Sequence, residues 1–308
     1  MATEEGWHTT EDGMKLYTKT WKAEGPAKAR LVFVHGFSDH CNAYGILFPT
    51  LATQGIEVLS FDQRGWGRSV HKPSEKGLTG PTARVLADIT SFLSTAIPCP
   101  VPLFLMGHSM GGAEVLCYAA EGPADTRKHI RGYLLESPFV DFNPASRPSH
   151  LTVIMGRIAG KLLPHKQMVQ VIDAKFLSRD PEVQKAFIED KLCHDTGTLE
   201  GLAGMLDRAA GLTSGKIKVG KSAGEGDVTR IWISHGTVDK VCSFDASKKL
   251  ADQLAAEDKE FKAYDGWYHK VHAEPTPDNE TFAYDVASWI LARSSEPVKS
   301  DGGAKSKL

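Results

Sequence analysis

Residues 107–111 read Gly-His-Ser-Met-Gly and so have the form G-x-S-x-G. In this pattern the serine occupies a very tight turn between a strand and a helix, and the glycines leave room for that turn. The apolar run 103–106 and the helical pattern 112–120 supply the strand and the helix. The hydroxyl would then stand at a helix N-terminus, where backbone N–H groups stabilise an anion. Ser109 is therefore the candidate nucleophile; the alternative is a glycine-rich turn with an incidental serine.

A serine hydroxyl needs a neighbouring base, and the base needs a third group to hold its tautomer. With this motif the acid and then the histidine follow the serine in the chain. Asp239 is the predicted acid because it follows the apolar run 231–233, and sites gather at the ends of such strands. Asp245, at an expected helix start, is the alternative. His269, after the last apolar run, is the predicted base, and His272 is its alternative.

A loop beginning His35-Gly36-Phe37 follows the apolar run 31–34. A loop at this place can aim a backbone N–H at the nucleophile. We expect the N–H groups of Phe37 and Met110 to form an oxyanion hole, in which each donor is typically worth about 10²–10³-fold in turnover. The alternative for the loop is a plain turn after a strand.

The sequence predicts neither a metal nor a cofactor. An odd number of cysteines without C-x-x-C spacing argues against a disulfide framework or a zinc site and favours a reducing compartment. His269 and His272 form an H-x-x-H pair, but no third ligand cluster accompanies it. The five cysteines are Cys41, Cys99, Cys117, Cys193 and Cys242.

The elements that must position these residues are short apolar runs, each ending in a turn. Runs without polar alternation are typical of strands buried on both faces, and their alternation with helices predicts a mostly parallel sheet flanked by helices. Asp12-Gly13 between two strand-like runs predicts a hairpin at the start of the chain. The runs cover residues 31–34, 58–61, 103–106, 133–135, 231–233 and 261–264, and a final helical stripe comprises Phe282, Val286 and Trp289.

Residues 143–226 interrupt this alternation and contain no clear strand. Two apolar stripes with helical spacing, 151–162 and 199–209, are followed by the Gly-, Ser- and Lys-rich stretch 213–226. We therefore expect a helical cap with a flexible return linker; the alternative is that these are crossover helices of the sheet. The expected core then comprises residues 1–142 and 227–293.

Charge and length exclude several classes of protein. Lys plus Arg number 36 and Asp plus Glu 38, so no nucleic-acid groove is expected. No apolar run is long enough to cross a bilayer, and the acidic start lacks the pattern of a signal peptide.

The last three residues, Ser306-Lys307-Leu308, match the peroxisomal import signal. They end a polar segment, 294–308, that we expect to be disordered. The sequence thus predicts the import receptor as a partner and the peroxisome as the location. The alternative is a solvated tail without a signal, with the protein in the cytoplasm or on lipid droplets.

Taken together, several segments resemble the monoacylglycerol lipases, in particular the fungal type, over most of residues 7–292. The resemblance implies the α/β-hydrolase fold and a helical cap that forms an apolar tunnel for the acyl chain. It also implies Ser109, Asp239 and His269 as the triad, with the oxyanion donors named above. The segments are 35–40, 61–67, 107–112, 235–242 and 266–269 with His272.

The resemblance further implies substrate contacts at Asp39, His272 and Cys242. Asp39 matches an acidic residue that helps to hold the glycerol end, His272 a histidine near that end, and Cys242 a cysteine close to the site in animal members. Two departures concern the glycerol end. Asp39 is shorter than the glutamate of animal members, and the arginine that they carry slightly downstream is Ala43 here.

These residues predict a serine hydrolase that cleaves fatty-acyl esters, in the first place monoacylglycerol to fatty acid and glycerol, through an acyl-enzyme on Ser109. Alternatives are an acyl-CoA thioesterase or a carboxylesterase of a peroxisomal metabolite, and a non-catalytic binding protein on the same fold. The amphipathic cap is expected to rest on a lipid surface; its alternative is burial against the core.

Overall fold

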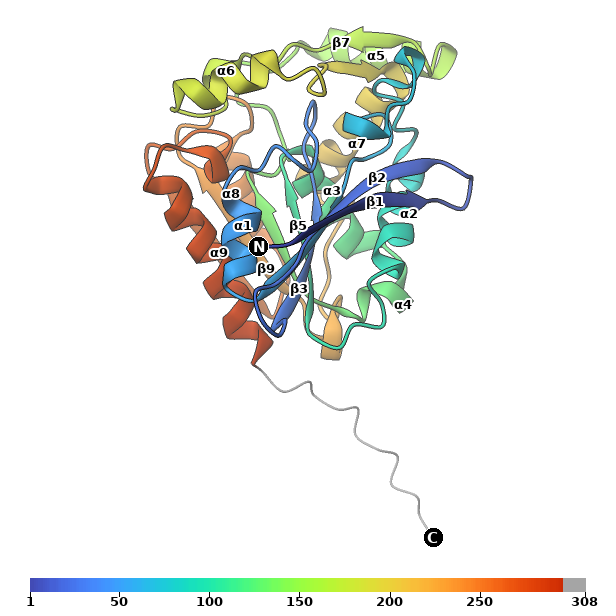
Figure 1. Cartoon of the computed structure of the whole chain (residues 1–308). Helices are drawn as coiled ribbons and strands as arrows, with labels where there is room; N and C mark the ends of the chain where they lie inside the picture. Colours follow the sequence, from blue (N-terminus) through green and yellow to red (C-terminus); the bar gives the residue numbers. More distant parts are fainter. Residues whose placement is uncertain (296–308) are drawn as a thin grey trace.

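The computed structural model describes residues 1–295, and its centre is an eight-stranded sheet of order β1-β2-β4-β3-β5-β6-β9-β10 (Figure 1). The six strands from β4 to β10 in this order run parallel, and the hairpin β1–β2 joins antiparallel at one edge. This confirms the predicted fold class. The strands are β1 Thr3–Thr9, β2 Lys15–Trp21, β3 Ala29–Val34, β4 Ile56–Phe61, β5 Leu103–His108, β6 Ile130–Glu136, β9 Arg230–Gly236 and β10 Asp258–Tyr264.

Helices cover both faces of the sheet (Figure 1). The apolar cluster on one face includes α1 and α9, and the cluster on the other includes α2, α3 and α8. Strands β3, β5 and β6 are buried along nearly their whole length because side chains on both of their faces meet helices. The bounds of these helices, with the short α4, are α1 Leu47–Thr53, α2 Thr82–Ser94, α3 Met110–Glu121, α4 Ala124–Arg127, α8 Phe244–Gln253 and α9 Asp278–Ser294.

The first hairpin and the apolar stripe of the last helix form as the sequence predicts. Gly13 has φ 81° in the turn between β1 and β2, a conformation that favours glycine. In α9 the stripe Phe282, Val286 and Trp289 is buried against the sheet. The described residues end at residue 295. Most of the tail that we expect to be disordered therefore lies outside them, including Ser306, Lys307 and Leu308.

The inserted segment lies over the carboxyl ends of the parallel strands (Figure 1). It contains three helices and one feature that the sequence does not predict, an antiparallel ribbon of two strands. Each strand has three residues, too few for an alternating pattern to be recognised. The elements are α5 His150–Leu162, β7 Gln167–Val169, α6 Pro181–Glu189, β8 Thr196–Thr198 and α7 Leu199–Ser214.

The end of the inserted segment also belongs to the core. Ala209 and Leu212 of α7 pack in the cluster that includes α2 and α3. In the stretch expected to be a flexible linker, Val219 and Ala223 are buried in the same cluster. The hydroxyl of Tyr133 donates to the carbonyl of Ala223 at 2.7 Å. This return stretch is thus packed, because two apolar residues dispersed among polar ones reach the core.

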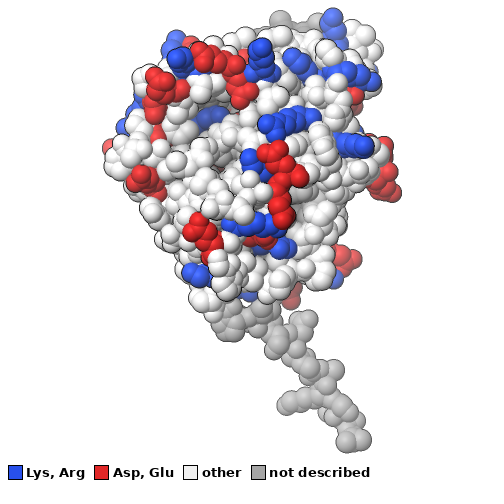
Figure 2. Space-filling model, in the orientation of Figure 1, with Lys and Arg blue, Asp and Glu red and all other residues white. Residues whose placement is uncertain are grey.

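One face of the molecule shows no continuous basic patch (Figure 2), and no described helix could span a membrane. On the face seen in Figure 2, basic and acidic side chains lie next to one another and most of the surface is uncharged. Within residues 1–295, no helix combines the length and apolar character that crossing a bilayer requires.

A buried ion pair fastens α7 to the core. Arg208 Nη2 lies 2.9 Å from Glu114 Oε1, and both side chains are almost fully buried. Arg208 also donates to the hydroxyl of Thr82 in α2. Burial raises the pKa of Glu114 to about 7, although the charge of Arg208 opposes this effect. The pair therefore links the inserted segment to the helix that begins beside Ser109.

We expect Arg208→Met to lower the free energy of unfolding by about 3–5 kcal/mol above neutral pH, because the Glu114 charge would remain buried without its partner. In the folded protein the carboxyl of Glu114 has a pKa of about 7. In the unfolded chain it loses its proton near the ordinary pKa of 4.5. Stability therefore falls as the pH rises through this window, and the variant should lose less at about pH 5. Urea unfolding at both pH values measures this.

The matched control is Arg157→Met, which removes an exposed ion pair with Asp207 from the same segment. It should cost about 0–1 kcal/mol at either pH. An equally small loss for Arg208→Met above neutral pH would contradict the role of the buried pair.

Candidate active site

Ser109 lies in the sharp turn between β5 and α3, with φ 54° and ψ −116°. A positive φ strains a residue with a side chain, and such strain persists where the surroundings enforce it. Here the two flanking glycines allow close packing. A Cβ on Gly107 would lie 2.3 Å from the carbonyl oxygen of Gly111, and one on Gly111 would lie 2.2 Å from that of Val34. A side chain at position 107 or 111 would therefore clash with the backbone, so this tight turn requires glycine at both positions.

The structure brings the predicted nucleophile, base and acid into one hydrogen-bonded line. His269 Nε2 lies 3.0 Å from Ser109 Oγ, and His269 Nδ1 lies 2.8 Å from Asp239 Oδ2. All three side chains are buried. The two alternatives lie elsewhere, since Asp245 is in the first turn of α8 and His272 bonds Glu136.

Four groups hold the carboxylate of Asp239. Its Oδ1 accepts the backbone N–H groups of Val241 at 2.7 Å and Cys242 at 2.9 Å. Its Oδ2 is shared by His269 and by His235 Nε2, which lies 2.9 Å away. Sequence reasoning missed the role of His235. The sequence pattern that could have revealed this role is a histidine near the end of a strand, four residues before the acid.

The electrostatics favour a charged pair when His269 takes a proton. Burial by itself raises the pKa of Asp239, but the charge of His269 and hydrogen bonds from His235 and His269 bring it below its usual range. Burial lowers the pKa of His269, but the Asp239 carboxylate outweighs this and raises it well above its ordinary value. The carboxylate therefore stabilises the imidazolium.

The two residues predicted to supply the oxyanion donors lie beside the nucleophile. Met110 is the first residue of α3, directly after the nucleophile. Phe37 follows β3, and its ring contacts that of Trp66 edge to face at 4.8 Å between centroids. Both residues line the same cavity as Ser109. The role of their backbone N–H groups as oxyanion donors stays a prediction.

This cavity has a volume of about 390 Å³, within the range of small-molecule sites. Ser109 lies in its wall, and the inserted segment supplies much of the rest. The wall is predominantly apolar, as a site for a hydrocarbon chain requires. Its large apolar side chains are those of Phe37, Met110, Phe139, Phe142, Val153, Met168, Val171, Ile172, Phe176, Leu199, Leu202, Met205, Leu206 and Val241.

The predicted headgroup residues Asp39 and His272 do not line this cavity. Asp39 is 1% exposed and pairs with Lys270, with 3.1 Å between Oδ2 and Nζ. His272 is also 1% exposed, and both its backbone N–H and its Nδ1 face one carboxylate oxygen of Glu136. The structure thus gives both residues partners within the protein. Their contact with a substrate headgroup stays a prediction.

Two further details concern the resemblance. Cys242 does lie at the site, with its Sγ 4.0 Å from Ser109 Oγ, and burial raises the pKa of its thiol. It is therefore a neutral neighbour of the nucleophile. Where animal members carry an arginine, this chain has Ala43, and the cation beside Asp39 is instead Lys270.

Three clusters of the described residues gather three possible metal-ligating atoms. His269 and His272 belong to different clusters and face different carboxylates, so the H-x-x-H pair does not assemble one site. The absence of a metal stays a prediction. The clusters are His40, Asp190 and Cys193; His108, Glu136 and His272; and Asp239, Cys242 and His269.

This arrangement can perform acyl transfer. A hydroxyl bonded to an imidazole, itself held by a carboxylate, can attack a carbonyl carbon, and two N–H groups can stabilise the resulting oxyanion. The apolar cavity beside the hydroxyl can hold the acyl chain.

Comparison with known proteins agrees with this chemistry. A model of the family described as "Serine aminopeptidase, S33" matches residues 25–276. A Schizosaccharomyces pombe protein named "Putative monoglyceride lipase" is 33% identical over 291 residues, which cover 93% of this chain and 74% of that one. The monoglyceride lipase of Rattus norvegicus is 28% identical over 289 residues, covering 92% of this chain and 88% of that one.

Solved structures share the fold. A soluble variant of monoglyceride lipase from Saccharomyces cerevisiae, in complex with a substrate analogue, has a TM-score of 0.85 at 24% identity, covering 96% of this chain and 97% of that one. The monoacylglycerol lipase of Paleococcus ferrophilus has a TM-score of 0.75 at 26% identity, covering 91% and 100%. Since the family model spans most of the chain and the first relative most of both chains, the chain belongs to the Serine aminopeptidase S33 family of the α/β-hydrolase superfamily.

Proposed function

We propose that this protein is a serine hydrolase that cleaves monoacylglycerols into a fatty acid and glycerol. Ser109 lies in the wall of an apolar cavity and forms one hydrogen-bonded line with His269 and Asp239, and this arrangement carries the proposal. The relatives named for this activity support the choice of substrate. The mostly apolar wall favours a long acyl chain.

The reaction follows from the geometry in two steps. Ser109 Oγ attacks the ester carbonyl while His269 Nε2 accepts its proton, and Asp239 stabilises the imidazolium. The N–H groups of Phe37 and Met110 receive the oxyanion. Glycerol leaves with the proton from His269. Water then attacks the acyl-enzyme with the same base, and the fatty acid is released.

Ser109→Ala should abolish hydrolysis of a monoacylglycerol, because it removes the hydroxyl that forms the acyl-enzyme. We expect turnover to fall by about 10⁶-fold, the scale seen when such a nucleophile is removed. Release of fatty acid from 1-monooleoylglycerol micelles measures this, with labelling by a fluorophosphonate probe as a second readout. Ser288→Ala, which changes an exposed hydroxyl in α9, is the control.

The same assay separates the rival activities. We expect a higher kcat/KM for the monoacylglycerol than for oleoyl-CoA or a short aryl ester. A preference for oleoyl-CoA would identify a thioesterase, and a preference for the aryl ester a carboxylesterase. Absence of probe labelling on the wild-type protein would identify a non-catalytic binding protein.

The acid limb of the pH profile should report the charge of His269. Because Asp239 raises the pKa of His269, the imidazole stays protonated to a higher pH, and kcat/KM should fall below a midpoint above 6.5. In Asp239→Asn the midpoint should move to lower pH and kcat should fall by about 10⁴-fold. A water-soluble ester measures both quantities.

Asp265→Asn serves as the control, because this exposed aspartate follows β10 and accepts a hydrogen bond from the hydroxyl of Thr237. It should leave the profile unchanged. An acid limb that stays in place in Asp239→Asn would contradict the assigned role of the carboxylate.

We further propose that α5 meets the lipid surface that supplies the substrate. One side of the helix lines the cavity through Thr152 and Val153. Large apolar side chains on the helix are open to solvent, and a helix with such a face can lie in a lipid interface. They are Leu151 (69% exposed), Ile154, Met155, Ile158 and Leu162 (75% exposed).

Replacing two of these side chains, as in the double variant Leu151→Glu and Ile158→Glu, should weaken binding to phosphatidylcholine vesicles by about tenfold or more, because burying each such side chain is worth about 1.5–3 kcal/mol. Turnover of a water-soluble ester should not change. Sedimentation with vesicles measures binding. Tyr284→Glu, an exposed aromatic of α9, is the control. Unchanged vesicle binding in the double variant would contradict this proposal.

Location stays a prediction from the sequence. The tripeptide Ser306-Lys307-Leu308 supports a proposal of import into peroxisomes, where the enzyme would degrade acyl esters. Its alternatives are the cytoplasm and the surface of lipid droplets.

A further inference from the structure

Lys270, directly after the catalytic histidine, has its ammonium group inside the protein. Its side chain is 7% exposed and that of its partner Asp39 is 2% exposed, with 3.1 Å between Nζ and Oδ2. Charged groups are costly to bury, even as a pair, so a buried pair calls for an explanation. This pair joins two loops of the active site, since Asp39 lies two residues after the oxyanion residue Phe37.

Asp39 holds both sides of the loop that carries Phe37. Its Oδ1 accepts the N–H of His40 at 2.9 Å. Its Oδ2 accepts the hydroxyl of Tyr44 at 3.1 Å, and the oxygen of that hydroxyl accepts the N–H of Gly36 at 3.2 Å. Gly36 and His40 stand on either side of Phe37 along the chain. The backbone N–H groups of both are connected by hydrogen bonds to the carboxylate of Asp39, that of Gly36 through the hydroxyl of Tyr44. The position of that carboxylate fixes the position of the loop.

Lys270 also contacts the inserted segment. Its backbone N–H donates to the carbonyl of Leu177 at 2.7 Å. Its ammonium lies over the ring of Phe187 in α6, 5.4 Å from the centroid. The lysine thus meets the oxyanion loop, the cap and, through the peptide bond, His269.

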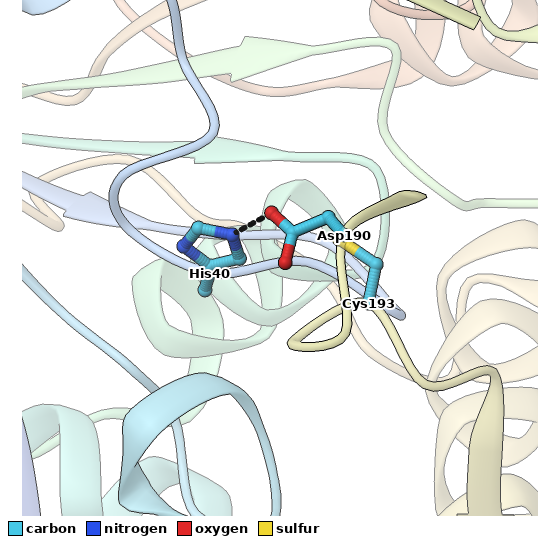
Figure 3. Close-up of side chains that lie close together, drawn as sticks. All are labelled: His40, Asp190 and Cys193. Atoms are coloured by element: carbon cyan, nitrogen blue, oxygen red, sulfur yellow. Dashed lines mark hydrogen bonds and ion pairs between the residues drawn. The ribbon is translucent and has the colours of Figure 1, made fainter. Parts of the chain in front are cut away.

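A second connection joins the same loop to the cap. His40 Nε2 lies 2.8 Å from Asp190 Oδ2, and Figure 3 shows the ring turned toward this carboxylate, with Cys193 beside it. Ser38 Oγ accepts the N–H of Asp195 at 3.0 Å. The inserted segment therefore holds this loop through Ser38 and His40, while Lys270 holds it through Asp39.

We propose that Lys270 is a positioning residue for the oxyanion hole, whose ammonium acts through Asp39 to hold the N–H of Phe37 toward the reacting carbonyl. This inference rests on the proposed hydrolase function and adds a residue to it. Oxyanion donors stabilise the transition state only when they are already aimed at the developing charge. Without the ammonium, Asp39 loses its counter-charge, and the hydrogen bonds to His40 and Tyr44 rearrange as the carboxylate turns toward water.

The test uses the full chain and the variants Lys270→Met and Lys270→Arg. Lys270→Met should lower kcat by about tenfold to a hundredfold with little change in KM, less than the loss of a whole oxyanion donor. Lys270→Arg keeps the charge and should recover most of the loss. Lys262→Met is the matched control, because Lys262 forms an ion pair of 2.7 Å with Asp285, between β10 and α9.

A second readout separates positioning from general stability. A trifluoromethyl ketone carrying an acyl chain forms an oxyanion on Ser109, so its inhibition constant should rise by the same factor as kcat/KM falls. The double variant Lys270→Met with Asp39→Asn removes both buried charges. It should regain thermal stability but not kcat, because a neutral pair does not hold the loop.

Folded Lys270→Met with wild-type kcat and wild-type affinity for the ketone would overturn the inference. Should this variant fail to fold, the double variant decides, and recovery of full kcat in it would likewise overturn the inference. Failure of the proposed function has a different signature, since the wild-type protein itself would then neither hydrolyse esters nor react with the ketone.

Discussion

The hydrogen bonds that converge on the carboxylate of Asp239 are the constraint on which the rest of the site depends. Two backbone N–H groups and two imidazoles bond this carboxylate, which is buried. Because its orientation is fixed from both oxygens, the ring of His269 has one favourable position, with Nε2 3.0 Å from Ser109 Oγ. Removing one of these bonds would leave a buried polar group to find another partner and would move the base.

The fold supplies this convergence by ending its parallel strands at one edge. β3 leads to the oxyanion loop, β5 to the strained turn of Ser109, β9 to Asp239 and β10 to His269. Residues far apart in the sequence meet there because the carboxyl ends of parallel strands lie side by side. The inserted segment closes the edge, and α7 both lines the cavity with Leu202 and packs into the core with Leu212. Helix α7 thus belongs both to the inserted segment and to the core. The shape of the cavity wall therefore depends on how the core packs.

The buried strands and the turn of Ser109 could be predicted from the sequence, because each depends on a short run of neighbouring residues. Buried strands appear as short apolar runs, and the turn of Ser109 appears as a motif whose glycines have steric reasons. Other features depend on contacts that no local pattern contains. Val219 and Ala223 pack on the core from a polar stretch. Lys270, an ordinary lysine in the sequence, is buried between Asp39 and the ring of Phe187 in α6. His235 could have been recognised from its spacing to the acid.

In the proposed reaction Ser109 attacks a carbonyl whose oxygen turns negative between the N–H groups of Phe37 and Met110. The most direct measurement is a crystal structure of the protein inactivated by a long-chain fluorophosphonate. We expect phosphorus bonded to Ser109 Oγ, a phosphoryl oxygen within about 3 Å of both N–H groups, and the alkyl chain in the apolar cavity. A phosphoryl oxygen that points away from both N–H groups, or a chain outside the cavity, would contradict the proposed reaction.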